Sequence, residues 1–197
     1  MDEFIEKVYL QELIQQCQYA IDAVDQMNEC LKNKNPGEFF REAGDFLQHS
    51  SAVSRILWPP GNTNRIKKKR AKHRGTYLKA TLTIADGHTL QTRSLRDHFE
   101  HFDERLDEWA ETSIHKNIVD NMISPRSAIG NVVKDDEIMR MYDPAKKEIV
   151  FRGETFNVQA LVDGVKDVQA KAKTRLQVVE ANKRLQPTGR ADGAPGG

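Results

Sequence analysis

The sequence predicts an all-α protein, an up-and-down antiparallel helix bundle of four helices plus a long C-terminal helix, with a small β-hairpin inserted. Three observations predict it. The chain has 197 residues, the size of one domain. Its 30% charged and 38% hydrophobic residues suit helices that each bury one apolar stripe. Apolar residues recur at steps of three and four, and the short connections between these stretches favour antiparallel neighbours.

The first two helices are predicted from such stripes and from the residues at their ends. The first covers about residues 2–32. The second begins after Asn35, a favourable N-cap, with Pro36 in the first helical position and Glu38 able to reach back to the cap. It ends at Trp58, because the prolines that follow disfavour helical geometry. The two stripes consist of Leu10, Leu13, Cys17, Ala20, Val24, Met27 and Leu31, and of Phe39, Ala43, Phe46, Ser50, Val53 and Leu57.

Two charged helices are expected next. The third covers about residues 64–84 and opens with a basic run. In the fourth, an apolar stripe continues without a break over residues 95–109, and Ser94 and Asp97 form a capping-box pattern at its start. The opposite face of the fourth helix is strongly acidic, with Asp97, Glu100, Asp103, Glu104, Asp107, Glu108 and Glu111.

The remainder of the chain is predicted to hold a hairpin, one more helix and a tail. Two apolar runs flank Asp143-Pro-Ala-Lys-Lys, which is typical of a short hairpin, and Asn157 can cap the last helix. The final residues are rich in Gly and Pro and are predicted to be disordered. The predicted boundaries are 1–185 for a single helical-bundle domain, 3–112 for its core, about 137–156 for the hairpin, about 157–185 for the last helix and 186–197 for the tail.

The composition also limits the cellular context. No apolar run approaches the roughly 20 residues that cross a bilayer, and the acidic, amphipathic start does not resemble a secretory signal. Cys17 and Cys30 are too few for a disulfide scaffold or a four-cysteine zinc site. We therefore expect a cytoplasmic protein with no membrane segment, metal or cofactor. The net charge of +1 gives no global case for nucleic acid, but the charges are segregated along the chain.

Reactive side chains concentrate at the start of the fourth predicted helix, where free N–H groups and the helix dipole favour an anion. One interpretation is a metal site, since His98 and His101 are neighbours on a helix, with Asp97 close and Glu100 assisting. Such a site needs a ligand from another helix, and His49 is the candidate. The side chains concentrated here are Arg93, Arg96, Asp97, His98, Glu100 and His101.

A second interpretation is acid–base chemistry on a phosphodiester. It needs a base with a pKa near neutrality and a fixed cation, and histidine and arginine meet these needs. Arg96 and His101 are five residues apart, about 7.5 Å along a helix axis and about 140° around it. The two side chains can therefore converge only in a cleft formed with another element or another subunit.

Arg96-Asp97-x-x-x-His101 resembles the Arg-polar-x-x-x-His motif of the HEPN superfamily, the higher eukaryotes and prokaryotes nucleotide-binding domains. Those proteins are compact helical bundles, and many are metal-independent endoribonucleases of toxin–antitoxin, abortive-infection and other defence systems. An overlapping pattern from Arg93 to His98 is a poorer match, because Ser94 is a weaker counterpart of the polar residue than Asp97. The resemblance covers the motif and the helix count over the predicted core, so the hairpin and the last helix would be an elaboration.

The resemblance implies a role for each residue of the motif. His101 would take the 2′-hydroxyl proton or protonate the leaving oxygen, and Arg96 would bind the scissile phosphate. Asp97 would orient His101, with Glu100 as a supporting acid. The resemblance also implies RNA as the substrate, a homodimer that brings two motifs together, and an antitoxin or other partner protein.

The basic run of the third helix is a candidate RNA-binding surface, because lysine and arginine near phosphate add salt-dependent affinity. A simpler interpretation is a solvated helix, or an electrostatic partner for the acidic face of the fourth helix. Two alternatives to a ribonuclease also stay open: a non-catalytic dimeric helix bundle that binds a partner protein, and nucleotide binding without cleavage. The basic run contains Arg65, Lys67, Lys68, Lys69, Arg70, Lys72 and Arg74.

Overall fold

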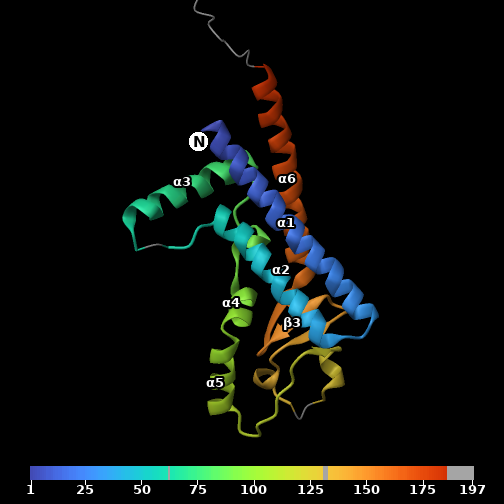
Figure 1. Cartoon of the computed structure of the whole chain (residues 1–197). Helices are drawn as coiled ribbons and strands as arrows, with labels where there is room; N and C mark the ends of the chain where they lie inside the picture. The colour runs from blue at the N-terminus through green and yellow to red at the C-terminus, as the bar shows by residue number, and fades with distance from the viewer. Residues whose placement is uncertain (62, 131–132, 186–197) are drawn as a thin grey trace, which may run out of the picture.

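The computed structural model describes residues 1–61, 63–130 and 133–185, so the tail predicted at 186–197 lies outside the described residues. Within these ranges the chain forms six α-helices and a small four-stranded sheet (Figure 1). None of the helices in the described ranges has the length and apolar character needed to cross a membrane. The helices are α1 (Glu3–Lys32), α2 (Pro36–Leu57), α3 (Arg65–Thr81), α4 (Ser94–Glu100), α5 (Phe102–Thr112) and α6 (Val158–Leu185).

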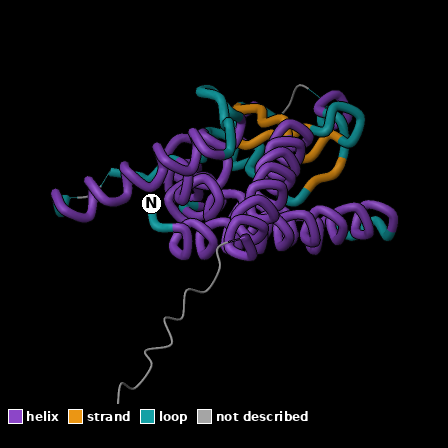
Figure 2. Tube along the Cα trace, turned by 90° about the horizontal axis from the view of Figure 1, so that it is seen from above, coloured by secondary structure: helices purple, strands orange, loops and turns teal. Residues whose placement is uncertain are grey.

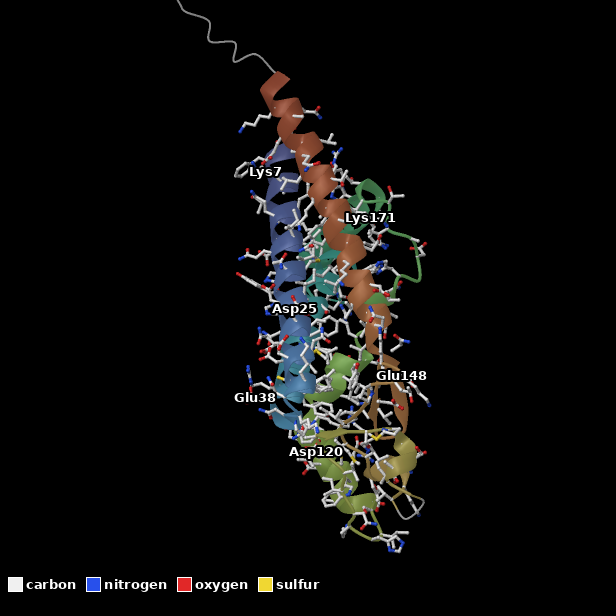
Figure 3. The ribbon with its side chains drawn as sticks, turned by 90° about the vertical axis from the view of Figure 1, so that its right-hand side faces the viewer. Lys7, Asp25, Glu38, Asp120, Glu148 and Lys171 are labelled. Atoms are coloured by element: carbon white, nitrogen blue, oxygen red, sulfur yellow. The ribbon has the colours of Figure 1, made fainter. Side chains whose placement is uncertain are left out.

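Helices α1, α2 and α6 form the long part of the molecule, and α1 packs against both of the others. Figure 3 shows α1 and α6 side by side, with Lys7 near the start of α1. Lys7 forms an ion pair of 2.7 Å with Glu180 of α6. The predicted stripes lie inside this packing, and α6 belongs to the core. Fully buried residues are Leu10, Leu13, Cys17 and Ala20 of α1, Phe39, Ala43, Val53 and Leu57 of α2, and Val165, Val168 and Ala172 of α6.

The predicted helix caps form at two helix starts. The side-chain oxygen of Asn35 accepts a hydrogen bond from the backbone N–H of Glu38 (3.3 Å), which satisfies one free donor of α2. The Glu38 carboxylate binds Arg41 (2.8 Å). At the start of α6, the side chain of Asn157 accepts from the backbone N–H of Ala160 (2.8 Å). These caps explain why the helix starts could be predicted to within one residue.

The sheet lies near the end of the molecule away from the N-terminus and is the orange part of Figure 2. Its strand order is β1-β2-β3-β4, with β1 parallel to β2 and the other two pairs antiparallel. The predicted hairpin is therefore present as the pair β2–β3, and β1 and β4 extend it. Because of this sheet the fold is mainly helical and not all-α. The strands are β1 (Met122–Ile123), β2 (Met141–Asp143), β3 (Glu148–Phe151) and β4 (Glu154–Asn157).

The prediction of one unbroken fourth helix is wrong, because the helix is interrupted at His101 (φ −103°, ψ 38°). The hydrogen-bond ladder is interrupted there: the N–H of His101 donates to the carbonyl of Asp97 (3.0 Å) at the end of α4, the N–H of Arg105 donates to the carbonyl of His101 (3.2 Å) at the start of α5, and in this described part of the chain no backbone bond runs from residues 102–104 back into α4. The apolar residues keep their three-four spacing in the sequence through this point, so periodicity gives no sign of the break. The predicted capping box does not form either, since Arg93 holds the N-cap position of α4 without a side-chain hydrogen bond.

Helix α3 leaves the body of the molecule and points away from it (Figures 1 and 2). Its buried residues, Gly75 and Leu78, lie in its C-terminal half. Gly75 marks the point where α3 crosses the end of α2: a Cβ at this position would lie 2.5 Å from the carbonyl oxygen of Leu57. Any larger residue would force the two helices apart, so glycine is required for this close approach.

Candidate functional site

The motif that resembles the HEPN pattern lies around the break between α4 and α5. The guanidinium of Arg96 binds the carboxylate of Glu100 and that of Asp97, the latter at 3.2 Å. His101 is half exposed, and its Nδ1 lies 3.2 Å from a carboxylate oxygen of Glu104. The side chain of Asp97 thus contacts Arg96, while His101 pairs with a residue one turn further along.

These contacts decide the electrostatics of the motif within one chain. Two carboxylates already balance the charge of Arg96, so a phosphate would have to displace them. Further carboxylates of α5 surround the motif, and phosphate approaching it meets like charge. Arg96 has a quarter of its side chain exposed and His101 about half, so both remain accessible to solvent. The arrangement is therefore accessible but has no free cation of its own.

His98 and His49 do not form part of a polar site. The His98 ring stacks on Phe151 at 4.8 Å, and its Nε2 lies 3.3 Å from Glu154. The Nδ1 of His49 lies 2.8 Å from the side-chain oxygen of Gln16 in α1. Among the residues that the structure describes, no three His, Cys, Asp or Glu side chains are grouped as metal ligands. The metal interpretation gains no ligand set from this geometry.

Helix α3 carries the other group of sequence-predicted residues, and most of them are unpaired. In residues 1–61, 63–130 and 133–185, no carboxylate lies within ion-pair distance of any of the seven predicted cations. Six of the seven are also exposed. The predicted neutralisation by the acidic helix therefore does not occur within one chain, since α3 and α5 lie far apart (Figure 1). The six are Arg65, Lys67, Lys68, Lys69, Arg70 and Lys72.

Arg74 differs from these six cations because it packs against the body of the molecule. Its guanidinium donates to the backbone carbonyls of Ile56 (3.2 Å) and Arg55 (3.0 Å) at the end of α2. It also lies over the ring of Tyr9, 5.4 Å from the centroid, in cation–π geometry. Arg74 therefore holds α3 in place and is not available to a ligand in the same way.

A buried cluster that the sequence analysis missed attaches α3 to α1 and α6. Glu6 is 2% exposed and accepts hydrogen bonds from Tyr77 (2.7 Å) and Arg175 (2.6 Å). Burial raises the pKa of the Glu6 carboxyl, but the hydrogen bonds from Arg175 and Tyr77 outweigh it, so this pKa lies below its usual value. Glu6 lies four residues before Leu10, on the apolar face of α1. A carboxylate at this position was the feature of the sequence that could have indicated a buried polar cluster.

The chain was also compared with known proteins. No protein-family model, no curated protein and no solved structure matches it. The resemblance to the HEPN superfamily therefore depends on the motif of residues 96–101 itself, and function must be inferred from the charges and contacts described above.

Proposed function

We propose that this protein binds RNA through the exposed cations of α3 and that it is a degenerate, HEPN-like relative of the metal-independent ribonucleases. The observation that supports it most is the set of six exposed cations between Arg65 and Lys72 that have no ion-pair partner among the described residues. Polyanion binding is the chemistry that such a segment suits, because each cation near a phosphate releases a counterion from the nucleic acid.

The spacing of these cations supports a backbone-binding surface. Like charges three or four residues apart destabilise an isolated helix, so an unpaired cluster is a cost that a bound polyanion would remove. Arg65, Lys68 and Lys72 follow one another at steps of three and four and share one face of α3. The nearest aromatic side chain of α3, Tyr77, donates its hydroxyl hydrogen to Glu6. Without a stacking platform, binding would be electrostatic and independent of base sequence.

The contacts of Arg96 are the reason to propose binding without cleavage. In-line attack on a phosphodiester requires a cation that is free to stabilise the developing charge. Arg96 already binds Glu100 and Asp97, and His101 binds Glu104. A single chain thus offers phosphate an acidic surface at the motif.

Cleavage by a dimer is a second candidate function. The specific observation in its favour is that Arg96 and His101 both face solvent and that neither contacts α6 in an ion pair or hydrogen bond among the described residues. A second copy could then supply the missing cation. The same proposal includes the finer predictions of an antiparallel bundle of HEPN type, a cytoplasmic location, and a toxin–antitoxin or defence role with a partner protein.

The binding experiment measures the affinity for a fluorescent single-stranded RNA by anisotropy at several salt concentrations. Replacing Arg65, Lys68 and Lys72 by Glu should weaken binding and reduce the slope of log K against log[salt] by about 2, at about 0.7 per phosphate contact. The matched control replaces three exposed lysines elsewhere, Lys134, Lys146 and Lys166. Equal losses in both variants, or no RNA binding by the natural chain, would contradict the proposal.

The cleavage experiment separates a degenerate protein from an active one. The natural chain and His101→Ala are incubated with the same RNA in the presence of EDTA. We expect intact RNA in both reactions. Products ending in a 2′,3′-cyclic phosphate that form with the natural chain and not with His101→Ala would overturn the degenerate assignment and establish the dimeric nuclease instead.

A further inference from the structure

A cleft of about 230 Å³ lies between α2, the segment that enters α4, strand β4 and the start of α6. It is separate from the exposed cations of α3. Its walls are mainly apolar, and they include the side chains of Leu47, Leu90, Leu95, Phe156 and Leu161. Because these residues come from four different elements, the cleft exists only in the folded chain.

The polar side chains around this cleft are largely satisfied by the protein itself. The hydroxyl of Ser50 donates to the carbonyl of Phe46 (2.7 Å), and that of Thr89 donates to the carbonyl of Ala160 (3.2 Å). Asn157 caps α6. Since these groups already have partners, the interior favours an apolar ligand body over a hydrogen-bonded polar one.

Arg93 is the exception among these polar side chains, because its charge has no partner in the described chain. Its positive charge indicates that the ligand is an anion. Arg93 is partly buried and lines the cleft, and its guanidinium donates one hydrogen bond, to the carbonyl of Trp58 (3.2 Å). Among the described residues no carboxylate lies within ion-pair distance of it, and no carboxylate lines the cleft. A half-buried cation without an anion is unfavourable, and the fork of a guanidinium matches a carboxylate.

The volume limits the size of the ligand. A cavity of about 150 Å³ lined by apolar side chains holds benzene. The present cleft, at about 230 Å³, has room for one ring and a short chain that carries a charged group.

We infer that this cleft binds a small organic carboxylate with an apolar body about the size of one aromatic ring, and that Arg93 pairs with its carboxylate. This site is independent of the proposed RNA surface, because Arg93 and the α3 cations lie on different elements. Arg96 also lines the cleft, but its charge is already balanced by Glu100 and Asp97.

The test uses two probes of the same shape, 3-phenylpropionate and its neutral amide, and isothermal titration calorimetry on the full chain. The natural chain should bind the carboxylate at least about 10-fold more tightly than the amide, as expected for a charge-assisted pair. Arg93→Gln should remove this preference and leave the affinity for the amide unchanged, which also shows that the cleft is still folded. Arg93→Lys keeps the charge and should retain most of the preference.

A second pair of variants tests the location. Ala160 lines the cleft, and Ala160→Phe should abolish binding of both probes by filling it. Ala170, ten residues further along α6, is exposed, so Ala170→Phe should bind like the natural chain. The inference is overturned if the natural chain does not prefer the carboxylate, if Arg93→Gln retains that preference, or if Ala160→Phe binds as well as Ala170→Phe.

Discussion

Helix α3 and the pair α4–α5 are both highly charged and both bury few residues, but they differ in how many of their charged side chains form ion pairs. Four of the seven carboxylates of α4–α5 have basic neighbours among the described residues: Asp97 and Glu100 bind Arg96, Glu104 binds His101, and Glu108 binds Arg105 (2.5 Å) and Arg152 (3.1 Å). Six cations of α3 have no such neighbour in the described residues. The comparison teaches that charge density does not identify a binding surface. A charge without a partner among the described residues is a better guide to such a surface, because it remains available to a molecule outside the chain.

The two regions also differ in how they are attached. The C-terminal half of α3 is held by the buried Glu6 cluster and by Arg74. Helix α5 has no buried residue, and hydrogen bonds from Arg152 and Trp109 attach it to the rest of the molecule. Four predictions can break or sharpen this comparison, and they follow in order of decreasing expected effect.

Glu6→Gln should have the largest effect. It leaves Arg175, a third of whose side chain is exposed, without its carboxylate and should lower the free energy of unfolding by about 1–3 kcal/mol. Because the folded-state pKa of Glu6 is lowered, this stabilisation is present above the unfolded pKa and is lost as the pH falls through the folded one. Urea denaturation followed by circular dichroism measures the change. Glu12→Gln on the exposed face of α1 is the control, and equal midpoints would contradict the role of the cluster.

Arg74→Gln and Arg70→Gln make the same chemical change at two positions of α3. Arg74 loses hydrogen bonds to two carbonyls and its position over Tyr9, which should cost about 1–2 kcal/mol. Arg70 is exposed and unpaired, and its replacement should change stability by less than about 0.5 kcal/mol. Thermal unfolding of both variants checks this. A larger loss of stability for Arg70→Gln than for Arg74→Gln would show that α3 packs against the molecule in another way.

Arg152→Gln should loosen α5 without unfolding the protein. Arg152 donates to the carbonyl of Arg105 (2.8 Å) and to Glu108, so its removal should cost about 1 kcal/mol locally. Hydrogen exchange should become faster in residues 102–112 and stay unchanged in α3. Unchanged exchange in α5 would mean that other contacts hold it.

His88 lies in the chain segment between α3 and α4. Its titration should make the free energy of unfolding depend weakly on pH. Burial lowers the pKa of this imidazole below its usual value of 6.5, although Asp167, at 3.5 Å, acts in the other direction. The unfolded chain therefore binds the proton more readily, and stability should fall as the pH drops through about 6.5 towards the lower folded value.

Thermal unfolding of the natural chain and of His88→Gln across this pH range measures the effect. The variant should lose the part of the pH dependence that lies nearest 6.5, while the acid-side loss that comes from Glu6 remains. Identical pH profiles for the two proteins would show that His88 titrates normally in the folded state.

Much of the helical structure could be predicted because helix signals are local. Asn35 and Asn157 cap the helices that they were expected to start, and the three-four stripes of α1 and α2 are buried except for Val24 and Leu31, which are partly buried. The hairpin was found from two apolar runs around a turn. Strand β1 was missed because it has two residues and its partner β2 lies far along the chain, so no local pattern marks it.

The candidate site, like the fold, could be predicted from the sequence only in part. The exposed cations of α3 were evident as a run of like charge. The partners of Arg96 and His101 were not evident, because Glu100, Asp97 and Glu104 all lie within reach on a helix and only the turn at His101 selects among them. Arg93 was set aside as a poorer motif match, and its place in a cleft depends on four elements that meet only after folding.

The amino-acid sequence by itself determined most of the helices, the caps of α2 and α6, most of the buried stripes and the separation of basic from acidic segments, since each depends on neighbours within about one helical turn. The tertiary structure decided which charges stay unpaired, where the fourth helix turns and which side chains enclose the cleft. Those features require residues such as Glu6 and Arg175, or Arg93 and Leu161, to meet across the fold. A contact between residues far apart in the chain produces no periodic pattern in the sequence. The energy of each such contact depends on its burial.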